Sequence, residues 1–562
     1  MAVPAAHPGR HDGTVPPTPP GEHPSHPDLL AICDTGLEAA TSLLQSAART
    51  LAASSLDEDQ AFAYDLAHAS ASVAAAEALV SRAHEEPAVT PFALVAAAEA
   101  AQGLVSATLG REETWGLEVA EPGGPALDDI RMLLRAGRSP ARIAELAGGP
   151  PGRGLGEELD LVADTFRRFA EERIRPVADQ IHRTNADIPE EILAGLAELG
   201  AFGLSIPEAY GGFAAQDEDT VLAMLVATEE LSRVSLGAGG SLVTRPEIVA
   251  RALLAGGTEA QRRAWLPRLA SGDVMAAVAV TEPDFGSDVA SLGTLATREA
   301  GGWSLSGTKT WCTFAARANV LALLARTDPD RSLAHRGLSL FLVEKPVTPS
   351  AGFLLHQSAE PGGPPGGGRL EGRPIDTLGY RGMHSYELAF DRWWVPGEAV
   401  VGGEAGAGRG FYLQMAGFEN GRLQTAARAV GVMQAAFEAA QSYAAGRRVF
   451  GRPLADYQLT RVKLGRMAAT VAATRALAYR AAALLASGGG TTEASMVKAY
   501  GCKAAEWVAR EAMQLHGGMG YAEEFPVSRY FVDARVLSIF EGADETLALK
   551  VIARQLVAAA GR

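Results

Sequence analysis

The chain contains 562 residues, of which 47% are hydrophobic, and it carries a formal net charge of -16. This length exceeds a single ordinary hydrophobic core, so we expect several packed domains. The negative charge, together with the lack of any run of Lys or Arg, disfavours nucleic acid as a partner.

Residues 1–27 are rich in Pro, with scattered His and Gly, and hold too little apolar material to offset the entropy of ordering. We therefore expect a disordered tail. Residues 1–8 also lack the basic start and the continuous apolar core of a secretory signal, so the cytoplasm is the expected location.

Residues 28–150 are Ala-rich and have the apolar period of helices. Asp28 is the expected N-cap of the first helix. Two stripes indicate buried faces: Leu30, Leu37, Leu44 and Leu51 form one, and Phe62, Leu66, Val73 and Val80 form the other. We predict an extra N-terminal domain of three to five helices, which ends at the Gly- and Pro-rich linker of residues 148–152.

The remaining sequence predicts three domains in the order helical, β, helical. Residues 155–273 have a helical stripe of Leu159, Val162, Phe166 and Phe169 and a tight turn at Tyr210-Gly211-Gly212. Residues 274–396 contain short strand-like runs at 303–307, 320–325, 338–343 and 386–390, with a Gly- and Pro-rich surface loop at 361–368. Residues 408–562 return to long helices, with Leu464, Met467 and Val471 on one face, as in a bundle.

The fold class is therefore mainly α with a central β domain. The apolar run Val274 to Val280 is far shorter than the roughly 18 residues that cross a bilayer, so we expect no membrane span. The three cysteines, Cys33, Cys312 and Cys502, lie far apart and match no metal-ligand spacing. Buried, reduced thiols are expected, with no disulfide framework and no metal site.

Glu541 is the candidate catalytic residue, because it stands between the apolar pair Ile539-Phe540 and Gly542, near the end of a long helical region. A carboxylate in this setting is poorly solvated. Desolvation raises the pKa of a carboxyl group and makes it a usable base toward a weak carbon acid. The alternative is a glutamate at a helix end beside a turn glycine.

Two segments of the β domain carry candidate binding groups. Residues 281–288 follow an apolar run and supply backbone N–H groups and hydroxyls that suit a polar ring edge or a phosphate. Residues 307–313 place the indole of Trp311 beside hydroxyls that suit a flat aromatic cofactor. The alternatives are a plain turn and a core tryptophan.

These segments, in this order, resemble the acyl-CoA dehydrogenase family from about Leu159 to the C-terminus. Three further motifs carry the resemblance: Phe-Glu-Asn-Gly-Arg at 418–422, Arg-Arg-Val-Phe-Gly-Arg-Pro-Leu at 447–454, and Gln-Leu-His-Gly-Gly-Met-Gly at 514–520. The resemblance implies a helical domain, a small β-barrel or sandwich and a C-terminal four-helix bundle, here with an extra N-terminal helical domain. It implies FAD as the cofactor.

The resemblance also implies roles for individual residues. Val280, Thr281, Trp311 and Thr313 would line the flavin ring, and Ser287 would lie between FAD and the acyl-CoA. The pyrophosphate and adenosine part would contact Arg447, Phe450 and Gln458, and Gln514, Gly517 and Gly518 of a neighbouring subunit. Glu419 and Arg422 would lie near the CoA, and Gly542 would flank the substrate. Ala543 and Glu545 stand where the family usually has a small hydroxyl residue and a Gln beside FAD.

In the resemblance Glu541 is the base that removes the α-proton of the thioester, while the β-hydrogen leaves as hydride to the flavin. The enolate would be stabilised by the Glu541 backbone N–H and a ribityl hydroxyl. The expected electron acceptor is electron-transfer flavoprotein, and the expected assembly is a homo-oligomer, a dimer rather than a tetramer.

The helical extension, the run Trp311-Cys312-Thr313 and the segments 379–391 and 422–428 resemble the branch of this family that acts in the ethylmalonyl-CoA pathway, and this resemblance implies methylsuccinyl-CoA as the substrate. The product would be mesaconyl-CoA (2-methylfumaryl-CoA). Arg245 is the candidate cation for the free carboxylate, with a solvent-facing arginine as the alternative. Other acyl-CoA substrates of the isovaleryl, 2-methylbutanoyl or glutaryl type, direct oxidation by oxygen, and a DNA-associated flavoprotein of the same fold remain alternatives.

Overall fold

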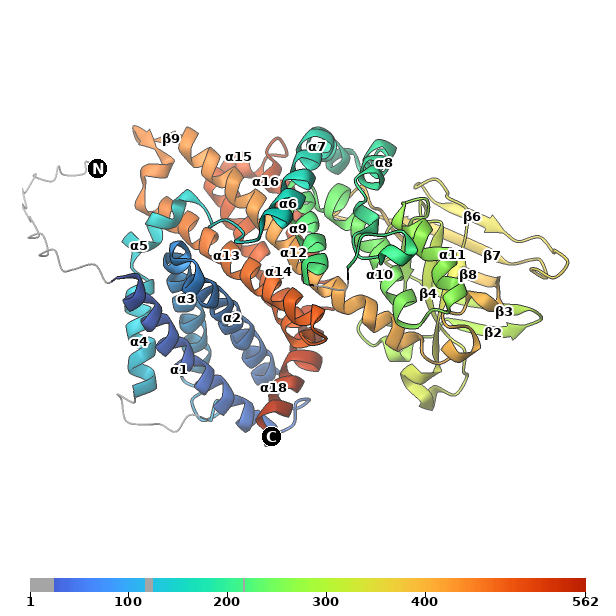
Figure 1. Ribbon diagram of the computed structural model, residues 1–562, viewed down its shortest axis with the longest axis horizontal. Helices are drawn as coiled ribbons and strands as arrows, with labels where there is room; N and C mark the ends of the chain where they lie inside the picture. The colour runs from blue at the N-terminus through green and yellow to red at the C-terminus, as the bar shows by residue number, and fades with distance from the viewer. Residues whose placement is uncertain (1–24, 117–124, 216–217, 562) are drawn as a thin grey trace, which may run out of the picture.

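The computed structural model describes residues 25–116, 125–215 and 218–561. Most of the expected tail of residues 1–27 lies outside them. The N-terminal and C-terminal helices lie together at one end of an elongated molecule, and the strands of the large sheet lie at the other end (Figure 1).

The N-terminal domain contains α1 (His26–Ala52), α2 (Gln60–Glu85), α3 (Thr90–Thr108), α4 (Pro125–Gly137) and α5 (Pro140–Glu145). The prediction that Asp28 caps the first helix is wrong. Ser25 is the N-cap, and its amide and hydroxyl donate to Asp28 Oδ2 over 2.9 and 2.6 Å. Asp28 is therefore the third residue of the helix, and its carboxylate accepts from the N-cap residue Ser25, as in a capping box.

Both predicted apolar stripes of this domain are buried. They pack in one core with residues of α13 (Gln458–Ala486) and α14 (Thr491–His516), among them Ala472 and Val497. Figure 1 shows α2 and α3 beside these two C-terminal helices. The extra domain thus covers the outer face of the C-terminal bundle.

One helical stretch of the described residues, Pro87–Thr108, has the length and mean hydropathy (1.4) of a membrane span, which the sequence prediction overlooked. In the fold, 56% of the 18 residues that give this hydropathy are buried inside the protein. A core helix of a soluble protein has the same composition, because apolar residues on all its faces contact other helices.

The second helical region contains α6 (Glu157–Phe169), α7 (Arg175–Thr184), α8 (Glu190–Glu198), α9 (Glu218–Val234), α10 (Ser241–Gly256) and α11 (Glu259–Ala270). The predicted tight turn is present between α8 and α9. Gly211 has a φ of 82°, and a Cβ at Gly212 would lie 1.9 Å from the Ile206 carbonyl oxygen. Only glycine fits both positions.

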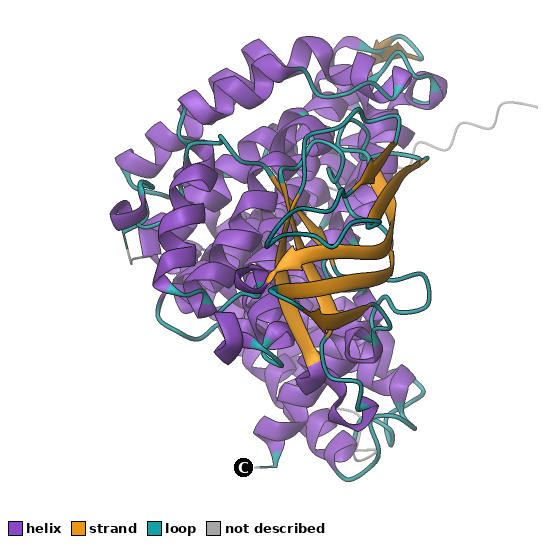
Figure 2. Cartoon of the chain, turned by 90° about the vertical axis from the view of Figure 1, so that its right-hand side faces the viewer, coloured by secondary structure: helices purple, strands orange, loops and turns teal. Residues whose placement is uncertain are grey.

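The β domain is one eight-stranded sheet with the order β1-β4-β2-β3-β8-β7-β6, in which β5 pairs with β4. Its strands are β1 (Ala276–Ala279), β2 (Leu295–Glu299), β3 (Gly302–Lys309), β4 (Val320–Arg326), β5 (Leu338–Glu344), β6 (Phe353–His356), β7 (Arg369–Ile375) and β8 (Ser385–Pro396). All four predicted strand runs lie in strands. Figure 2 shows the sheet curving over one side of the helices, and residues 361–368 connect β6 to β7.

The C-terminal region begins with α12 (Gly410–Gly446), followed by a short hairpin of β9 (Arg448–Val449) and β10 (Arg452–Pro453). After α13 and α14 come α15 (Gly518–Tyr521), α16 (Pro526–Leu537), α17 (Asp544–Leu547) and α18 (Ala553–Ala560). The predicted face of Leu464, Met467 and Val471 is buried, and all three cysteines are buried and free, as predicted.

Candidate active site

Glu541 lies in the loop between α16 and α17, and its side chain is only 4% exposed. The predicted desolvation of this carboxylate is therefore confirmed. The backbone of Glu541 is left-handed with a φ of 55°, and Gly542 follows with a φ of 98°. A non-glycine residue in this conformation is strained, and it persists only where the surrounding contacts fix it.

The carboxylate of Glu541 is incompletely satisfied. Oε1 lies 3.4 Å from Arg245 Nη1 and 3.9 Å from Arg428 Nη2. Oε2 is buried without a hydrogen-bond partner among the described residues. A Cβ at Gly421 would come within 3.0 Å of that oxygen, so the glycine keeps the space beside it open. One oxygen of the candidate base is thus left free for a ligand.

Arg245 of α10 and Arg428 of α12 are both buried, so the solvent-facing alternative for Arg245 is wrong. Arg245 also donates to the Tyr380 hydroxyl over 3.0 Å. Arg428 donates to Thr425 Oγ1 over 2.8 Å, and its guanidinium lies 4.9 Å from the ring centre of Phe540. Two buried cations therefore share one carboxylate, and burial lowers the pKa of Arg428.

A second buried carboxylate, Glu247, lies one turn of helix from Arg251 on α10. Its Oε1 is 3.7 Å from Arg251 Nε, while its Oε2 has no partner within the described part of the chain. Burial raises the pKa of Glu247, which favours its neutral form. A neutral Glu247 would not balance the positive charge of Arg245 and Arg428. Sequence reasoning gave neither Glu247 nor Arg428 a role: Glu247 lies in no motif, and Arg428 was noted only as the last residue of the segment 422–428.

The loop of Glu541 is held from two sides. The buried Lys498 of α14 donates from Nζ to the carbonyl oxygen of Gly542, and burial lowers the pKa of Lys498. On the side of the β domain, the Thr546 hydroxyl donates to Ser287 Oγ over 2.9 Å. The structure therefore places the predicted residue Ser287 against Thr546 of α17, five residues after Glu541.

The two predicted cofactor segments of the β domain are tied to each other. Lys309 Nζ donates to Glu282 Oε1 over 2.8 Å and to the Val280 carbonyl oxygen over 3.0 Å. The Thr310 amide donates to the Thr281 carbonyl oxygen over 2.8 Å. These bonds fix the loop after β1 against the loop after β3, which places Val280 and Thr281 beside the segment of Trp311.

Trp311 is 56% exposed, whereas the side chains of Trp303, Trp393 and Trp394 in the same domain are buried. The alternative of a core tryptophan at this position is therefore wrong. Its φ of 58° is left-handed, and the Thr313 hydroxyl behind it is buried 3.1 Å from Ser385 Oγ. A half-exposed indole beside fixed hydroxyls fits a flat aromatic ring.

The residues predicted for the nucleotide end lie on the surface of the single chain. Phe450, at the tip of the β9–β10 hairpin, is 98% exposed. All six members of this group are exposed: Arg447, Phe450, Gln458, Gln514, Gly517 and Gly518. The single chain does not enclose them, in contrast to Glu541.

The remaining predicted residues lie near the loop of Glu541 or on the adjoining part of α12. Glu419 Oε1 accepts from Thr491 Oγ1 over 3.4 Å, and Arg422 Nη1 donates to Ser495 Oγ over the same distance. Both contacts join α12 to the start of α14. Ala543 is half-buried before α17, and Glu545 is exposed.

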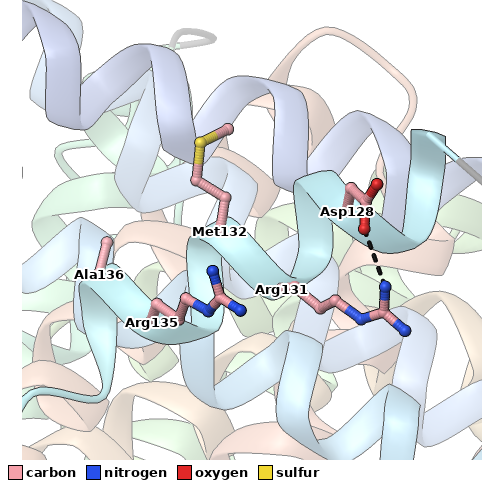
Figure 3. A pocket seen from close by; sticks show the side chains of 5 residues that line it. All are labelled: Asp128, Arg131, Met132, Arg135 and Ala136. Atoms are coloured by element: carbon pink, nitrogen blue, oxygen red, sulfur yellow. Dashed lines mark hydrogen bonds and ion pairs between the residues drawn. The ribbon is translucent and has the colours of Figure 1, made fainter. Parts of the chain in front are cut away.

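A hollow on the surface of the N-terminal domain has a different character (Figure 3). It is lined by residues of α4 alone: Asp128, Arg131, Met132, Arg135 and Ala136. Asp128 already pairs with Arg131 over 2.8 Å, and both side chains are exposed. A solvated ion pair on one helix is not an arrangement for catalysis.

Three family models match successive parts of the chain, described as acyl-CoA dehydrogenase, N-terminal domain (residues 156–273), middle domain (277–393) and C-terminal domain (408–557). The extra helices lie before the first match. The chain is 43% identical over 457 residues to a (2S)-methylsuccinyl-CoA dehydrogenase of Cereibacter sphaeroides, covering 80% of this chain and 79% of that protein. This coverage exceeds residues 156–562, so the similarity reaches into the extra helices.

Two solved structures show the same fold. Butyryl-CoA dehydrogenase from Megasphaera elsdenii is 29% identical with a TM-score of 0.64, over 72% of this chain and 99% of that one. A glutaryl-CoA dehydrogenase from Mycobacterium smegmatis in complex with FADH2 is 25% identical with a TM-score of 0.61, over 73% and 96%. The chain belongs to the acyl-CoA dehydrogenase family, whose members are FAD-dependent oxidoreductases that act on the CH–CH bond of acyl-CoA thioesters.

Proposed function

We propose that this dehydrogenase oxidises methylsuccinyl-CoA to mesaconyl-CoA and passes the electrons to electron-transfer flavoprotein. The similarity to the Cereibacter sphaeroides enzyme supports the choice of substrate. The observation that carries the proposal is the pair of buried arginines beside Glu541.

The charge balance around Glu541 favours a substrate with a free carboxylate. Arg245 and Arg428 are both buried, yet one carboxylate serves both of them at 3.4 and 3.9 Å. A buried guanidinium without an adequate counter-ion is costly, and Glu247 tends toward its neutral form. The second carboxylate of a dicarboxylyl thioester would supply the missing negative charge. An acyl chain that ends in a methyl group would not.

Glu541 is the proposed base. Its Oε2 has no partner among the described residues, so it is available to accept the α-proton of the thioester. Its backbone N–H also donates to no other described residue, which leaves it free to stabilise the thioester oxygen as the enolate forms. Bound FAD supplies the hydride acceptor for the β-hydrogen.

Val280, Thr281, Trp311 and Thr313 are proposed to hold the flavin ring, because the two loops that carry them are tied together and leave an indole accessible. The surface group of Arg447, Phe450, Gln458, Gln514, Gly517 and Gly518 is proposed to bind the nucleotide end across the interface of a homodimer. The 98% exposure of Phe450 supports this assembly, since an exposed phenylalanine at a hairpin tip suits an interface.

The substrate proposal is tested with two thioesters that differ only in the group in question. Methylsuccinyl-CoA and 2-methylbutanoyl-CoA have the same branched skeleton, but the first ends in a carboxylate and the second in a methyl group. We expect wild type to favour methylsuccinyl-CoA in kcat/KM. Arg245→Met should lower this preference by about 100-fold, because it removes one member of a buried charge pair.

Arg251→Met is the matched control. Arg251 lies on the same helix and pairs with Glu247, but no ion pair joins it to Glu541. It should keep the wild-type preference. The ratio of the two substrates is the informative quantity, because any effect of Arg245 on the base itself cancels. An unchanged ratio in Arg245→Met would remove Arg245 from this role, and a wild-type preference for 2-methylbutanoyl-CoA would overturn the substrate.

A further inference from the structure

A polar cluster joins the extra N-terminal domain to the loop of the proposed base. Tyr64 and His68 lie one turn apart on α2, and Asp544 follows Glu541 by three residues. The Tyr64 hydroxyl donates to Asp544 Oδ2 over 2.6 Å, and His68 Nε2 lies 3.1 Å from the same oxygen. Lys503 Nζ of α14 lies 3.3 Å from it. The sequence separation of 480 residues between Tyr64 and Asp544 makes this a purely tertiary contact.

Asp544 is a firm attachment point. Its side chain is 8% exposed, and its amide donates to the Ser538 carbonyl oxygen over 3.1 Å, which closes the loop of residues 538–544. Burial alone would raise the pKa of Asp544, but the bonds from His68 and Tyr64 outweigh burial and lower it. The carboxylate is therefore charged when it accepts these bonds, and bonds to a charged acceptor are the stronger kind.

The chain that follows is also embedded in the extra domain. Ala548, Ile552 and Ala553 are fully buried in the core that contains the stripes of α1 and α2. Lys550 pairs with Asp57, in the connection between α1 and α2, over 2.8 Å. Figure 1 shows α18 beside α1. The extra domain thus determines where the segment immediately after the proposed base lies.

We infer that Tyr64 and His68 are positioning residues for Glu541. They hold Asp544, and Asp544 fixes the exit of a loop in which Glu541 keeps its left-handed backbone. Lys498 fixes the middle of the same loop through the carbonyl oxygen of Gly542. A strained conformation persists only when several contacts determine it, and here one set of contacts comes from a domain that lies outside the matched dehydrogenase domains. The inference rests on the proposed role of Glu541 as the base.

The test compares Tyr64→Phe, His68→Leu and the double variant with wild type, as FAD-loaded enzymes. Hydrogen exchange of residues 538–547 without substrate reports the order of the loop. In the double variant we expect faster exchange confined to this segment, a fall in kcat with methylsuccinyl-CoA of about tenfold, and a KM within about twofold, because a misplaced base slows proton removal without weakening CoA binding.

Glu99→Gln is the matched control. Glu99 of α3 pairs with Arg466 of α13 over 2.6 Å, so it also joins the extra domain to the C-terminal bundle, but away from Asp544. In the Glu99→Gln variant, hydrogen exchange of residues 538–547 and kcat should equal those of wild type. His68→Gln should restore most of the rate lost in His68→Leu, because its amide can donate to Asp544.

Unchanged exchange and kcat in the double variant would overturn the inference. So would a rate loss accompanied by faster exchange in all helices, or matched by Glu99→Gln, since either result indicates a general structural role. If the double variant does not fold, Tyr64→Phe alone carries the test, because it removes a single hydroxyl. The exchange readout needs no substrate. A wild-type enzyme that fails to oxidise methylsuccinyl-CoA would therefore overturn the substrate proposal and leave this result standing.

Discussion

Two buried clusters of carboxylates and guanidinium groups lie in the same helical framework, and they differ in how completely their hydrogen bonds are made. The first, here called the Glu229 cluster, consists of Glu229, Glu230, Arg153, Arg167 and Arg475. Glu229 accepts from Arg475 Nη2 over 2.6 Å and from Arg153 Nη2 over 3.2 Å. Glu230 accepts two bonds from Arg167, over 3.0 and 2.9 Å, and one from Arg153.

The second, here called the Glu541 cluster, consists of Glu541, Arg245, Arg428 and Glu247. Its closest carboxylate–guanidinium distance is 3.4 Å. Three of its polar atoms have no partner among the described residues: Glu541 Oε2, Glu247 Oε2 and Arg245 Nε. In the Glu229 cluster, Arg153 Nε is the one such atom among the described residues, and neither carboxylate has one.

The difference separates stability from function. Buried polar groups are normally satisfied, so a cluster with every carboxylate oxygen bonded holds the fold together. A cluster that stays incomplete inside a packed protein keeps its groups available for a ligand, at some cost in stability. The Glu229 cluster joins the linker residue Arg153 to α6, α9 and α13, while the Glu541 cluster surrounds the proposed base.

The largest expected effect is on activity, from Glu541→Gln. Loss of the base should slow reduction of bound flavin by anaerobic methylsuccinyl-CoA by about 10²- to 10⁴-fold. The free energy of unfolding should fall as well, since Arg245 and Arg428 lose the carboxylate they share, but by less than in a cluster with complete hydrogen bonds, because these contacts are long. Stopped-flow absorbance and urea unfolding measure the two quantities. Equal flavin bleaching in wild type and variant would contradict the assignment of the base.

Glu229→Gln should produce the opposite pattern. It leaves Arg475 and Arg153 without a buried counter-ion, so we expect a loss of about 3–5 kcal/mol in the free energy of unfolding. The rate of flavin reduction in the folded variant should stay near that of wild type. Urea unfolding followed by circular dichroism gives the first value. A variant as stable as wild type would show that the Glu229 cluster does not stabilise the packing of α6, α9 and α13.

The stability supplied by Glu229 should depend on pH. Burial alone would raise the pKa of Glu229, but the charges of Arg475 and Arg153 outweigh it and lower the pKa from 4.5 to about 2. A lowered pKa in the folded state means that the contribution is complete above about pH 4.5 and is lost as the pH falls toward 2.

The stability difference between wild type and Glu229→Gln should accordingly shrink by roughly 3 kcal/mol over that window. Unfolding curves of both proteins at successive pH values provide the measurement. A difference that stays constant down to pH 2 would indicate that charge is not its origin.

The smallest effect is expected from Glu247→Gln. Burial raises the pKa of Glu247, so the folded state binds this proton more tightly than the unfolded chain, and stability falls as the pH rises past the unfolded value. Glutamine mimics the neutral form and removes that penalty. At pH 8 the variant should be as stable as wild type or more stable by about 1 kcal/mol, as measured by urea unfolding. A marked destabilisation would mean that the charged form of Glu247 is the one the fold uses.

Much of the fold could be predicted from local patterns. The seven-residue stripe of Leu30, Leu37, Leu44 and Leu51 identified a buried helix face, because helix geometry places such residues on one side. The strand runs of the β domain were identified by their short apolar pattern. The cap at Ser25 was missed, since Asp28 is an equally good capping type and only the backbone geometry distinguishes the two.

The candidate site was predictable only in part. Glu541 and Trp311 stand in local motifs, so their positions follow from the sequence. Glu247 and Lys498 stand in ordinary helical contexts without a motif, and the segment 422–428 that contains Arg428 does not show that its guanidinium lies beside Glu541. All three residues join the site because α10, α12 and α14 pack around one loop.

The sequence by itself determined which segments form helices and strands, and which short motifs carry an acid, an indole and a glycine-rich turn, because these depend on residues close in the chain. Tertiary structure alone decided that two arginines share one carboxylate and that Tyr64 reaches Asp544. Contacts of this kind depend on how helices pack, and packing brings together residues whose separation along the chain carries no information about their distance in space.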